Sequence, residues 1–337
     1  MTAAERDALS TGAATVEAVV RAGGPQLTQL LGRTEDRLLA LAAAGGQTLA
    51  RHATATISAG GKRLRPLLVF LAAGDVADAA AEERLVRAAV AVELIHSASL
   101  VHDDVLDAAS LRRGKPTVVA AAGRTIATAT GDLLFSRAFA ELAAGGELED
   151  VRALSAAASA LAQGELIQRA DAWDARVPLE RYLYRCELKT GSLFEAACRL
   201  GALGGGFEER IVDALALFGR RIGLAFQLLD DVLDVSGPAS RTGKLRGTDL
   251  LDGTVTLPLI LAREREPLLA QLDLSALDTP EQAEAVCEQI AATGALELAR
   301  QRALAVVEQA RVGLPELAPA QQHALELVAE GVVERYA

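Results

Sequence analysis

Residues 88–107 read AAVAVELIHSASLVHDDVLD, an apolar run that ends in three aspartates. Through this run and just before it, apolar or small residues recur every three or four positions, at Leu85, Val86, Ala89, Val92, Ile95 and Ser99. That spacing places their side chains on one face of a helix. A second run with the same period spans residues 215–229. Both stretches therefore predict buried amphipathic helices.

Helix-forming residues dominate the rest of the chain as well. Ala and Leu are abundant, and sustained alternation of β-branched residues is missing, so we predict an all-α fold. Gly and Pro gather at short intervals, which predicts roughly ten or more helices joined by short loops. Because no shift in composition marks a boundary, we expect one domain over residues 1–337. Within it, residues 1–24 are a candidate for a loosely attached N-terminal segment.

The composition restricts the class of protein. Of 337 residues, 51% are hydrophobic and only 3% are aromatic, so the core must be built mainly from Ala, Leu and Val. A net charge of −11 argues against binding nucleic acid or an anionic membrane through overall charge. Three cysteines without a CxxC pattern fit a reducing compartment, as free core thiols. The charged N-terminal residues and the lack of a long uncharged apolar stretch predict a cytoplasmic protein with no membrane span.

One acidic pentapeptide occurs twice. Residues 103–107 and 230–234 both read DDVLD and lie 127 positions apart (230 − 103), each at the end of an apolar helical run. The first and last aspartates of each copy share a helical face, so each triad repels itself unless a cation binds there. Oxygen-only ligands favour Mg²⁺, which readily shares its shell with a phosphate. A single acidic triad is more often a solvated surface, but two identical ones after buried helices favour a diphosphate site.

Lysine is scarce, which makes each lysine informative. Among 34 basic residues only four are lysines: Lys62, Lys115, Lys189 and Lys244. All four lie in short motifs, GGKRLRP at residues 60–66, RRGKPT at 112–117, KTG at 189–191 and TGK at 242–244. Lysine charges, arginine forks and helix-start amides are groups that hold phosphate. Their distribution through an acidic protein predicts more than one bound phosphate group.

Together these motifs resemble the trans-isoprenyl diphosphate synthase (polyprenyl synthetase) family. The resemblance runs from about residue 25 to the end, with the motifs in family order and at family spacing. It depends on residues 60–66, 94–117, 131–132, 189–191 and 223–258. It implies a single large helical bundle of the isoprenoid synthase type with a central substrate cavity. It also implies a homodimer that uses Mg²⁺, with three ions per active site.

The resemblance further implies a role for each motif residue. Six aspartates would hold Mg²⁺: Asp103, Asp104, Asp107, Asp230, Asp231 and Asp234. Five residues would contact the diphosphate of an allylic substrate: Arg112, Lys189, Thr190, Gln227 and Lys244. Four would hold isopentenyl diphosphate: Lys62, Arg65, His96 and Arg113. From the residues alone, His96 is better explained as a core histidine, whereas Gln227 lies three residues before Asp230 and therefore on the aspartate face.

The reaction implied is the head-to-tail (1′-4) condensation of isopentenyl diphosphate with an allylic diphosphate to give an all-trans polyprenyl diphosphate. Ionisation of the allylic C–O bond, attack by the double bond and loss of a proton need no side-chain nucleophile. Two alternatives stay open: an ionising terpene cyclase on the same scaffold, and a non-catalytic subunit of a heteromeric prenyl synthase. A cyclase needs only one diphosphate site. A supporting subunit gives no reason for both triads and all four lysines to coexist.

Three positions bear on specificity. Residues four and five before the first aspartate act as a floor for the product in this family when they are aromatic, and here they are Ser99 and Ala98. Because both are small, the channel should continue past Ile95 and Val92, about one and two turns deeper, with Phe135 and Phe139 as candidates for a deeper floor. The product should then be geranylgeranyl diphosphate or longer. Thr254 stands where many relatives carry lysine, so one cation of the allylic site is missing or is replaced by an arginine from elsewhere.

Overall fold

The two apolar runs form two 28-residue helices, α5 (Ala79–Leu106) and α11 (Glu209–Ser236). The computed structural model describes residues 17–44, 46–112, 114–237 and 246–334 of the chain. Asp78 fixes the start of α5, because its carboxylate accepts a hydrogen bond from the backbone N–H of Ala81 at 3.0 Å. The two acidic pentapeptides therefore occupy similar positions, at the C-terminal ends of two long helices.

Helices make up nearly all of the other regular structure. The first half contains α2 (Gly24–Ala43), α3 (Gln47–Ser58), α4 (Leu64–Ala73), α6 (Val118–Ala122), α7 (Arg124–Ala143) and α8 (Leu148–Ala170). The second half contains α9 (Leu179–Cys186), the π-helical turn η1 (Glu187–Gly191), α10 (Ser192–Gly204), α13 (Thr248–Leu251), α14 (Leu257–Arg263), α15 (Pro267–Ala270), the 3₁₀ turn η2 (Leu274–Ala276), α16 (Pro280–Ala292), α17 (Ala295–Val312) and α18 (Pro319–Glu334). The predicted all-α fold is confirmed. Within the described ranges its exception is a two-stranded hairpin of β1 (Leu111–Arg112) and β2 (Lys115–Pro116).

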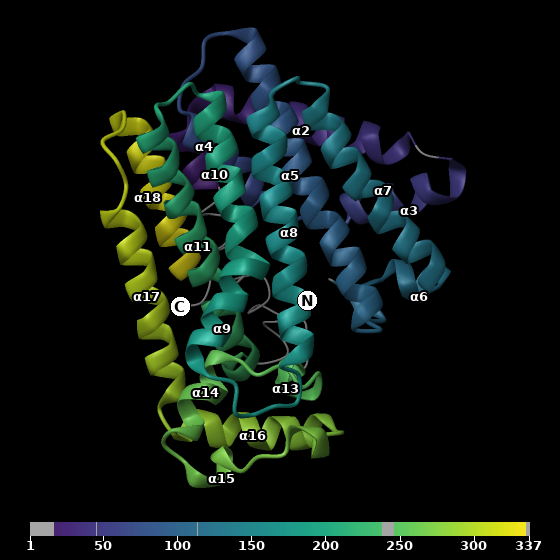
Figure 1. The fold of residues 1–337 in the computed structure, drawn as a ribbon, viewed down its shortest axis with the longest axis vertical. Coiled ribbons are helices and arrows are strands. Elements are labelled where there is room, and N and C mark those ends of the chain that lie inside the picture. The colour runs from purple at the N-terminus through teal and green to yellow at the C-terminus, as the bar shows by residue number, and fades with distance from the viewer. Residues whose placement is uncertain (1–16, 45, 113, 238–245, 335–337) are drawn as a thin grey trace.

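α5 runs through the middle of the bundle (Figure 1). Helices α2, α4, α7, α8 and α10 all pack against it. Every residue from 88 to 95 is buried, including Glu93. The expectation of an amphipathic helix is therefore wrong for α5, because a helix with neighbours all round buries every face rather than one stripe.

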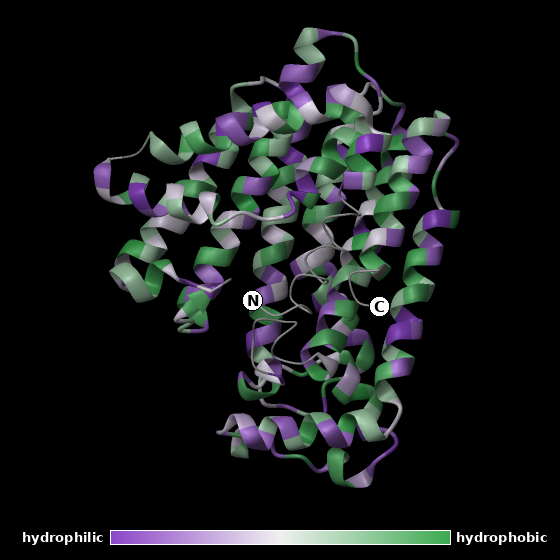
Figure 2. Ribbon diagram, turned by 180° about the vertical axis from the view of Figure 1, so that it is seen from behind, coloured by the Kyte–Doolittle hydropathy of each residue, from purple (hydrophilic) through white to green (hydrophobic). Residues whose placement is uncertain are grey.

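α17 shows the amphipathic pattern that α5 lacks. Its buried residues follow each other at three- or four-residue spacing: Ala295, Ala299, Ala303, Val307 and Ala310. They face α11 and α14, and Figure 2 shows hydrophilic and hydrophobic residues alternating along this outer helix. Small alanines on the inner face let α17 lie close to the bundle.

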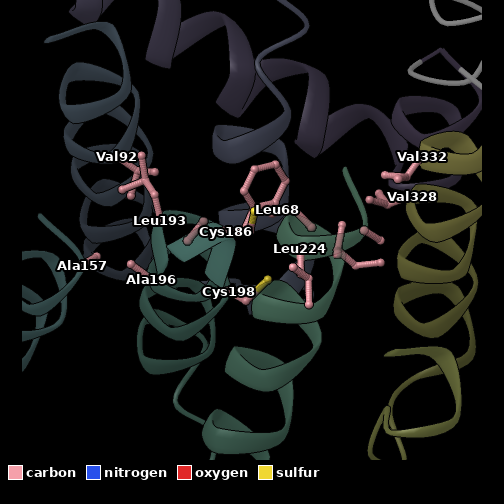
Figure 3. Packing of buried hydrophobic residues seen from close by; sticks show 14 of the residues in the cluster. Leu68, Val92, Ala157, Cys186, Leu193, Ala196, Cys198, Leu224, Val328 and Val332 are labelled. Atoms are coloured by element: carbon pink, nitrogen blue, oxygen red, sulfur yellow. The ribbon is translucent and has the colours of Figure 1, made fainter. Parts of the chain in front are cut away.

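One hydrophobic cluster extends through the chain, from Val19 to Val332. Figure 3 shows side chains of α4, α5, α10, α11 and α18 converging in it. Gly201 allows α10 to approach α4 closely, because a Cβ at this position would lie only 2.1 Å from the carbonyl oxygen of Val69. Since Val19 belongs to the cluster, the described part of the expected loose N-terminal segment is packed against the core. Residues 1–16 lie outside the described residues.

The three cysteines are buried and free, as predicted. Burial raises the pKa of Cys186 and that of Cys287 to about 12. The pKa of Cys198 is raised as well, again mainly by burial. All three thiols are therefore protonated at neutral pH and act as small core side chains.

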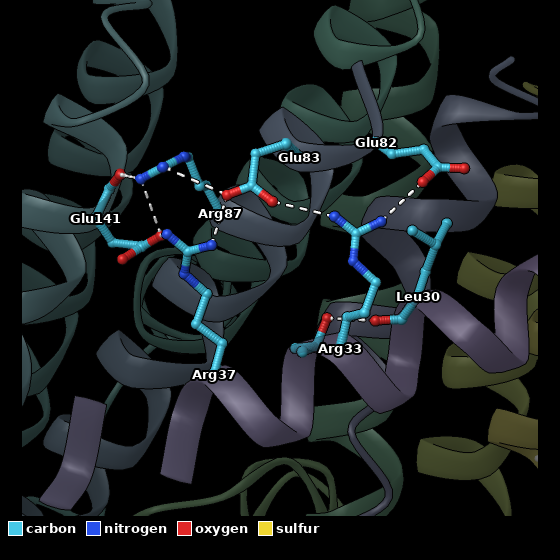
Figure 4. A network of polar contacts seen from close by, with 8 residues as sticks. Leu30, Arg33, Arg37, Glu82, Glu83, Arg87 and Glu141 are labelled. Carbon is cyan, nitrogen blue, oxygen red and sulfur yellow. Dashed lines mark hydrogen bonds and ion pairs between the residues drawn. The ribbon is translucent and has the colours of Figure 1, made fainter. Parts of the chain in front are cut away.

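Ion pairs tie α2 to α5 and α7 at the end of α5 that lies away from the aspartates (Figure 4). Arg33 of α2 donates to Glu82 and Glu83 at 2.7 and 3.0 Å. Arg37 pairs with Glu141 of α7 at 2.7 Å. Arginines of the chain itself therefore balance the carboxylates at this end of the helix.

Within the described residues, α5 is the one helix that is long and apolar enough to cross a membrane. Of its most apolar 18-residue window, 78% is buried inside the protein. The apolar surface of this helix is therefore used in the core.

Candidate active site

The first aspartate triad receives arginines from two other segments. Arg112 of the hairpin donates from Nε to Oδ1 of Asp104 at 2.7 Å, and Asp104 is only 5% exposed. Arg169, near the end of α8, donates from Nη2 to Oδ1 of Asp107. Two of the three carboxylates of this triad are therefore held by guanidinium groups.

Asp103, the first aspartate of this triad, has a perturbed pKa. Burial is the largest cause and raises the pKa of Asp103 to about 6. The charge of Lys189 opposes the rise, while the carboxylates of Glu165 and Asp107 add to it. An additional cation near Asp103 would therefore favour its ionised form.

α8 contributes a carboxylate that the sequence did not single out, Glu165. This side chain accepts a hydrogen bond from Arg169 Nε at 2.8 Å and forms an ion pair with Lys189 Nζ. Burial acts to raise its pKa, but the charges and hydrogen bonds of Lys189 and Arg169 together lower it. Gly164 makes the approach possible, since a Cβ there would lie 2.5 Å from the backbone nitrogen of Lys189. A glycine in the middle of a helical pattern was the available signal.

The middle aspartate of the second triad accepts hydrogen bonds from uncharged donors. Asp231 is 3% exposed and accepts hydrogen bonds from the hydroxyl of Tyr182 and from Gln227 Nε2, the latter at 2.8 Å. Burial and then the charge of Asp249 raise the pKa of Asp231. Asp234 Oδ2 accepts a hydrogen bond from the backbone N–H of Asp249 at 3.3 Å. Tyr182 is a site residue that the sequence analysis missed, because nothing in its local pattern distinguishes it from a core aromatic.

The turn η1 connects the two triads. Lys189 acts on the first, through its charge on Asp103. The next residue, Thr190, donates from Oγ1 to Gln227 Oε1 at 2.7 Å, and Gln227 in turn donates to Asp231. Single π-helical turns of this kind often occur at functional sites. Two neighbouring residues therefore reach, one of them through Gln227, aspartates that are 128 positions apart (231 − 103) in the chain.

The two arginines of the GGKRLRP motif have different environments. Arg63 has a structural role, and Arg65 is a candidate for binding an anion. Arg63, with a left-handed φ of 47°, donates to Glu35 at 2.9 and 3.0 Å and to Glu93 at 2.7 Å. Arg65 lies with its guanidinium 4.5 Å from the ring centroid of Phe194, and its buried Nε has no hydrogen-bond partner. Burial lowers the pKa of Arg65 to about 10, an effect that the charge of Glu93 opposes. A buried donor without a partner fits an incoming anion.

The other predicted substrate residues occupy a range of environments. Lys62 is exposed just before α4, and His96 is partly buried in α5. The backbone carbonyl of His96 accepts a hydrogen bond from Ser99 Oγ at 2.8 Å. Arg113 and Lys244 lie outside the described residues. Lys115 is exposed in β2, opposite Arg112 in the hairpin register.

Phe135 lies at the level of the aspartates, not below them. Its ring stacks on His102, with centroids 5.8 Å apart and an interplanar angle of 14°, and His102 directly precedes Asp103. Gly131 gives this histidine room, because a Cβ there would lie 2.2 Å from His102 Nε2. Phe135 is therefore wrong as a deeper floor. Phe139, one turn along α7, stays a candidate.

The residues expected to line the product channel are all buried. Val92, Ile95 and Ala98 have no exposed surface, and Ser99 is 7% exposed. No aromatic side chain occupies position 98 or 99 of α5.

Thr254 lies near the end of α8. The backbone N–H of Trp173 donates to the carbonyl of Gly253 at 2.8 Å, and a Cβ on Gly253 would meet the indole ring of Trp173 at 2.3 Å. Trp173 lies three residues beyond the end of α8, so the loop that contains Thr254 packs against the segment that follows α8.

The donor set suits a hard divalent cation. It consists of carboxylate oxygens, and burial raises the pKa values of Asp103 and Asp231, with neighbouring carboxylates adding to the rise. Within the described residues, no three His, Cys, Asp or Glu side chains already converge on a point that could hold a metal ion. An ion at the first triad would add a second cation beside the arginines that already contact Asp104 and Asp107.

Comparisons with known proteins agree with this geometry. The sequence profile of the polyprenyl synthetase family matches residues 46–293. The chain is 43% identical over 220 residues to heptaprenyl diphosphate synthase component 2 of Geobacillus stearothermophilus, covering 64% of this chain and 67% of that protein. It is 35% identical over 288 residues to geranylgeranyl diphosphate synthase of Methanosarcina mazei, covering 83% and 87%.

A solved structure extends the agreement to the whole fold. The polyprenyl synthase of Caulobacter crescentus, crystallised with calcium and isoprenyl diphosphate, superposes with a TM-score of 0.85 at 33% identity, covering 96% of this chain and 98% of that one. Profile, relatives and fold all coincide with the aspartate and lysine motifs read from the sequence. The chain belongs to the polyprenyl synthetase family.

Proposed function

We propose that this prenyltransferase condenses isopentenyl diphosphate head-to-tail with an allylic diphosphate, releases diphosphate and makes an all-trans polyprenyl diphosphate of geranylgeranyl length or longer. One observation carries the proposal. The turn η1 presents Lys189 to the first aspartate triad and Thr190, through Gln227, to the second. One short turn thereby contacts both acidic helices, which supports a diphosphate bound between them.

The residues of the chain would bind and orient the allylic diphosphate. Asp103, Asp107 and Asp230 are the proposed ligands of Mg²⁺, with Asp104, Asp231 and Asp234 supporting them, and we propose three ions per site. The metal, when bound, would neutralise charge on the leaving diphosphate. Lys189, which is largely buried, would place a fixed positive charge at the same oxygens. Thr190, Gln227, Arg112 and Lys244 would complete this site.

Arg65 would hold the diphosphate of the second substrate. Its unpartnered Nε and its position over Phe194 support this role, and Lys62, His96 and Arg113 would assist. The ion pairs of Arg63 with Glu35 and Glu93 anchor the start of α4, whose second residue is Arg65. Holding the double bond next to the ionised allylic carbon converts a bimolecular step into one within the complex.

Incubation with labelled isopentenyl diphosphate, one allylic starter at a time and Mg²⁺ tests the reaction. We expect label in all-trans polyprenyl diphosphates and loss of turnover in EDTA. Cyclic hydrocarbon without incorporated label would instead support a terpene cyclase. Activity that required a second chain would support a subunit role, which the name of the Geobacillus relative, component 2, makes worth testing.

The absence of aromatic residues at positions 98 and 99 supports a product longer than farnesyl diphosphate. Ala98→Tyr would place a ring in the path along α5 and should shorten the product, with size measured by chromatography. Leu166→Tyr, at an exposed position on α8 (69% exposed), is the matched control. An unchanged product from Ala98→Tyr would refute the channel along Ile95 and Val92.

We further propose a cytoplasmic homodimer. The family resemblance supports the dimer, and the three free, buried cysteines fit the reducing cytoplasm. Light scattering coupled to size-exclusion chromatography would measure the mass in solution, and a mass close to 35.1 kDa, that of one chain, would refute the dimer.

A further inference from the structure

The last turns of α8 place two oppositely charged side chains beside the first aspartate triad. Glu165 and Arg169 are four residues apart and therefore share a helical face. Glu165 Oε1 accepts from Arg169 Nε at 2.8 Å, while the other oxygen of Glu165 pairs with Lys189. Glu165 is only 8% exposed, so it is a fixed anchor for both cations.

The far end of the Arg169 side chain is attached to the triad itself. Its Nη2 donates to Asp107, the C-terminal cap of α5. The Arg169 side chain is 36% exposed, compared with 11% for that of Glu165. The Nε edge of the guanidinium is therefore held by the buried Glu165. Its Nη2 joins α8 to α5 by binding Asp107, a carboxylate that is partly accessible.

The charges around this bridge are nearly balanced by the chain alone. Asp103, Asp104, Asp107 and Glu165 contribute four negative charges, and Arg112, Arg169 and Lys189 contribute three positive ones. A divalent ion at Asp107 would lie next to the guanidinium of Arg169, and the two positive charges would repel each other. The contact with Asp107 must then open. The contact with Glu165 can stay, because Glu165 is outside the proposed ligand set.

We infer that Arg169 changes its binding partner when metal ions occupy the first triad. It neutralises Asp107 in the metal-free enzyme, and when ions occupy the triad it turns about its anchor on Glu165 to bind an oxygen of the allylic diphosphate. A planar guanidinium is suited to this, since its fork matches both carboxylate and phosphate. This inference rests on the proposed function.

Two calorimetric titrations test the exchange: Mg²⁺ into metal-free enzyme, and inorganic diphosphate into enzyme saturated with Mg²⁺. Arg169→Gln should bind Mg²⁺ about three- to tenfold more tightly than wild type, because the competing guanidinium is gone, and should bind diphosphate about tenfold more weakly. Arg169→Lys, which keeps the charge, should return the Mg²⁺ affinity towards that of wild type.

Arg152→Gln is the matched control, since Arg152 lies on the same helix and forms an exposed ion pair with Glu149. It should match wild type in both titrations. Unchanged or weaker Mg²⁺ binding by Arg169→Gln, unchanged diphosphate binding, or an Arg169→Lys protein as altered as the glutamine variant would each overturn the inference. Circular dichroism and melting temperature establish that the variants fold. Turnover by wild type, measured separately, decides whether the proposed function itself fails.

Discussion

The two aspartate triads have identical sequences and different surroundings. Both read DDVLD at the end of a 28-residue helix. In the first, the middle aspartate pairs with Arg112 and the last with Arg169. In the second, the middle aspartate accepts hydrogen bonds from Tyr182 and Gln227. The middle aspartate of the same five residues therefore pairs with a guanidinium in one copy and with uncharged donors in the other.

This difference shows how the two helices can have separate tasks in one site. Arginine partners can be exchanged for another cation, and the first triad borders the hairpin and α8, which supply them. The buried hydroxyl of Tyr182 has no such alternative, so Asp231 is fixed in place and holds Gln227 and Thr190 in turn. The first triad is suited to loading and release, and the second to positioning.

Lys189→Ala removes the cation that η1 places beside the first triad. Of the variants considered, it should have the largest effect on activity. We expect kcat to fall about 10²–10³-fold, the loss typical of one group that stabilises developing negative charge in a water-excluded site. Lys115→Ala, at an exposed position in β2, serves as the control. A loss below tenfold in steady-state assays would show that Lys189 does not act on the leaving group.

Asp103→Asn tests the charge imbalance at the first triad in metal-free protein. An aspartate with a pKa of about 6 in the folded chain and about 4 in the unfolded chain stays protonated to a higher pH when the chain is folded. Stability is then full below about pH 4 and falls as the pH rises to about 6, by at most about 3 kcal/mol. The asparagine variant should therefore be more stable than wild type at pH 8 and equal to it at pH 4.

Urea unfolding in EDTA at the two pH values measures this difference in the free energy of unfolding. Asp36→Asn, which changes an exposed carboxylate on α2, should leave the pH dependence as it is. A wild-type protein that gained stability between pH 4 and pH 6 relative to Asp103→Asn would contradict the environment described for Asp103.

Tyr182→Phe tests the fixed character of the second triad. Removing the hydroxyl leaves a buried oxygen of Asp231 without a donor, which should lower the free energy of unfolding by about 1–3 kcal/mol. Tyr184→Phe changes the same atom at a residue that is 53% exposed and should cost less than about 0.5 kcal/mol. Equal losses in the two variants would mean that the hydroxyl of Tyr182 contributes nothing specific.

Thr190→Val breaks the hydrogen-bonded connection from η1 to the second triad. Of the variants considered, it should have the smallest effect on activity. The lost hydrogen bond to Gln227 is worth about 1 kcal/mol, so kcat should fall about five- to tenfold. The stability of the protein should change little, because valine has nearly the same shape. A fall as large as that of Lys189→Ala would remove the proposed difference between the two sides of η1.

Most site residues predicted from the sequence carry a recognisable local signal. The repeated pentapeptide marks the aspartates, and the rarity of lysine marks Lys62 and Lys189. Glu165 has only the neighbouring Gly164 as a signal, and Arg169 and Tyr182 carry none, because charged residues four apart on a helix and buried aromatics are common in any helical protein. Phe135 was misplaced for a related reason: residue spacing along α7 does not reveal which turn of α5 it faces.

The sequence by itself determined the helical class, the two acidic helix ends and the family, because helix periodicity and motif spacing are local properties of the chain. Only the tertiary structure decided which partner each aspartate received and that η1 connects the two triads. Those pairings join residues up to 62 positions apart at the first triad and 49 at the second. They depend on how closely α8 and η1 can approach each other, a distance set by packing at Gly164 that no local pattern records.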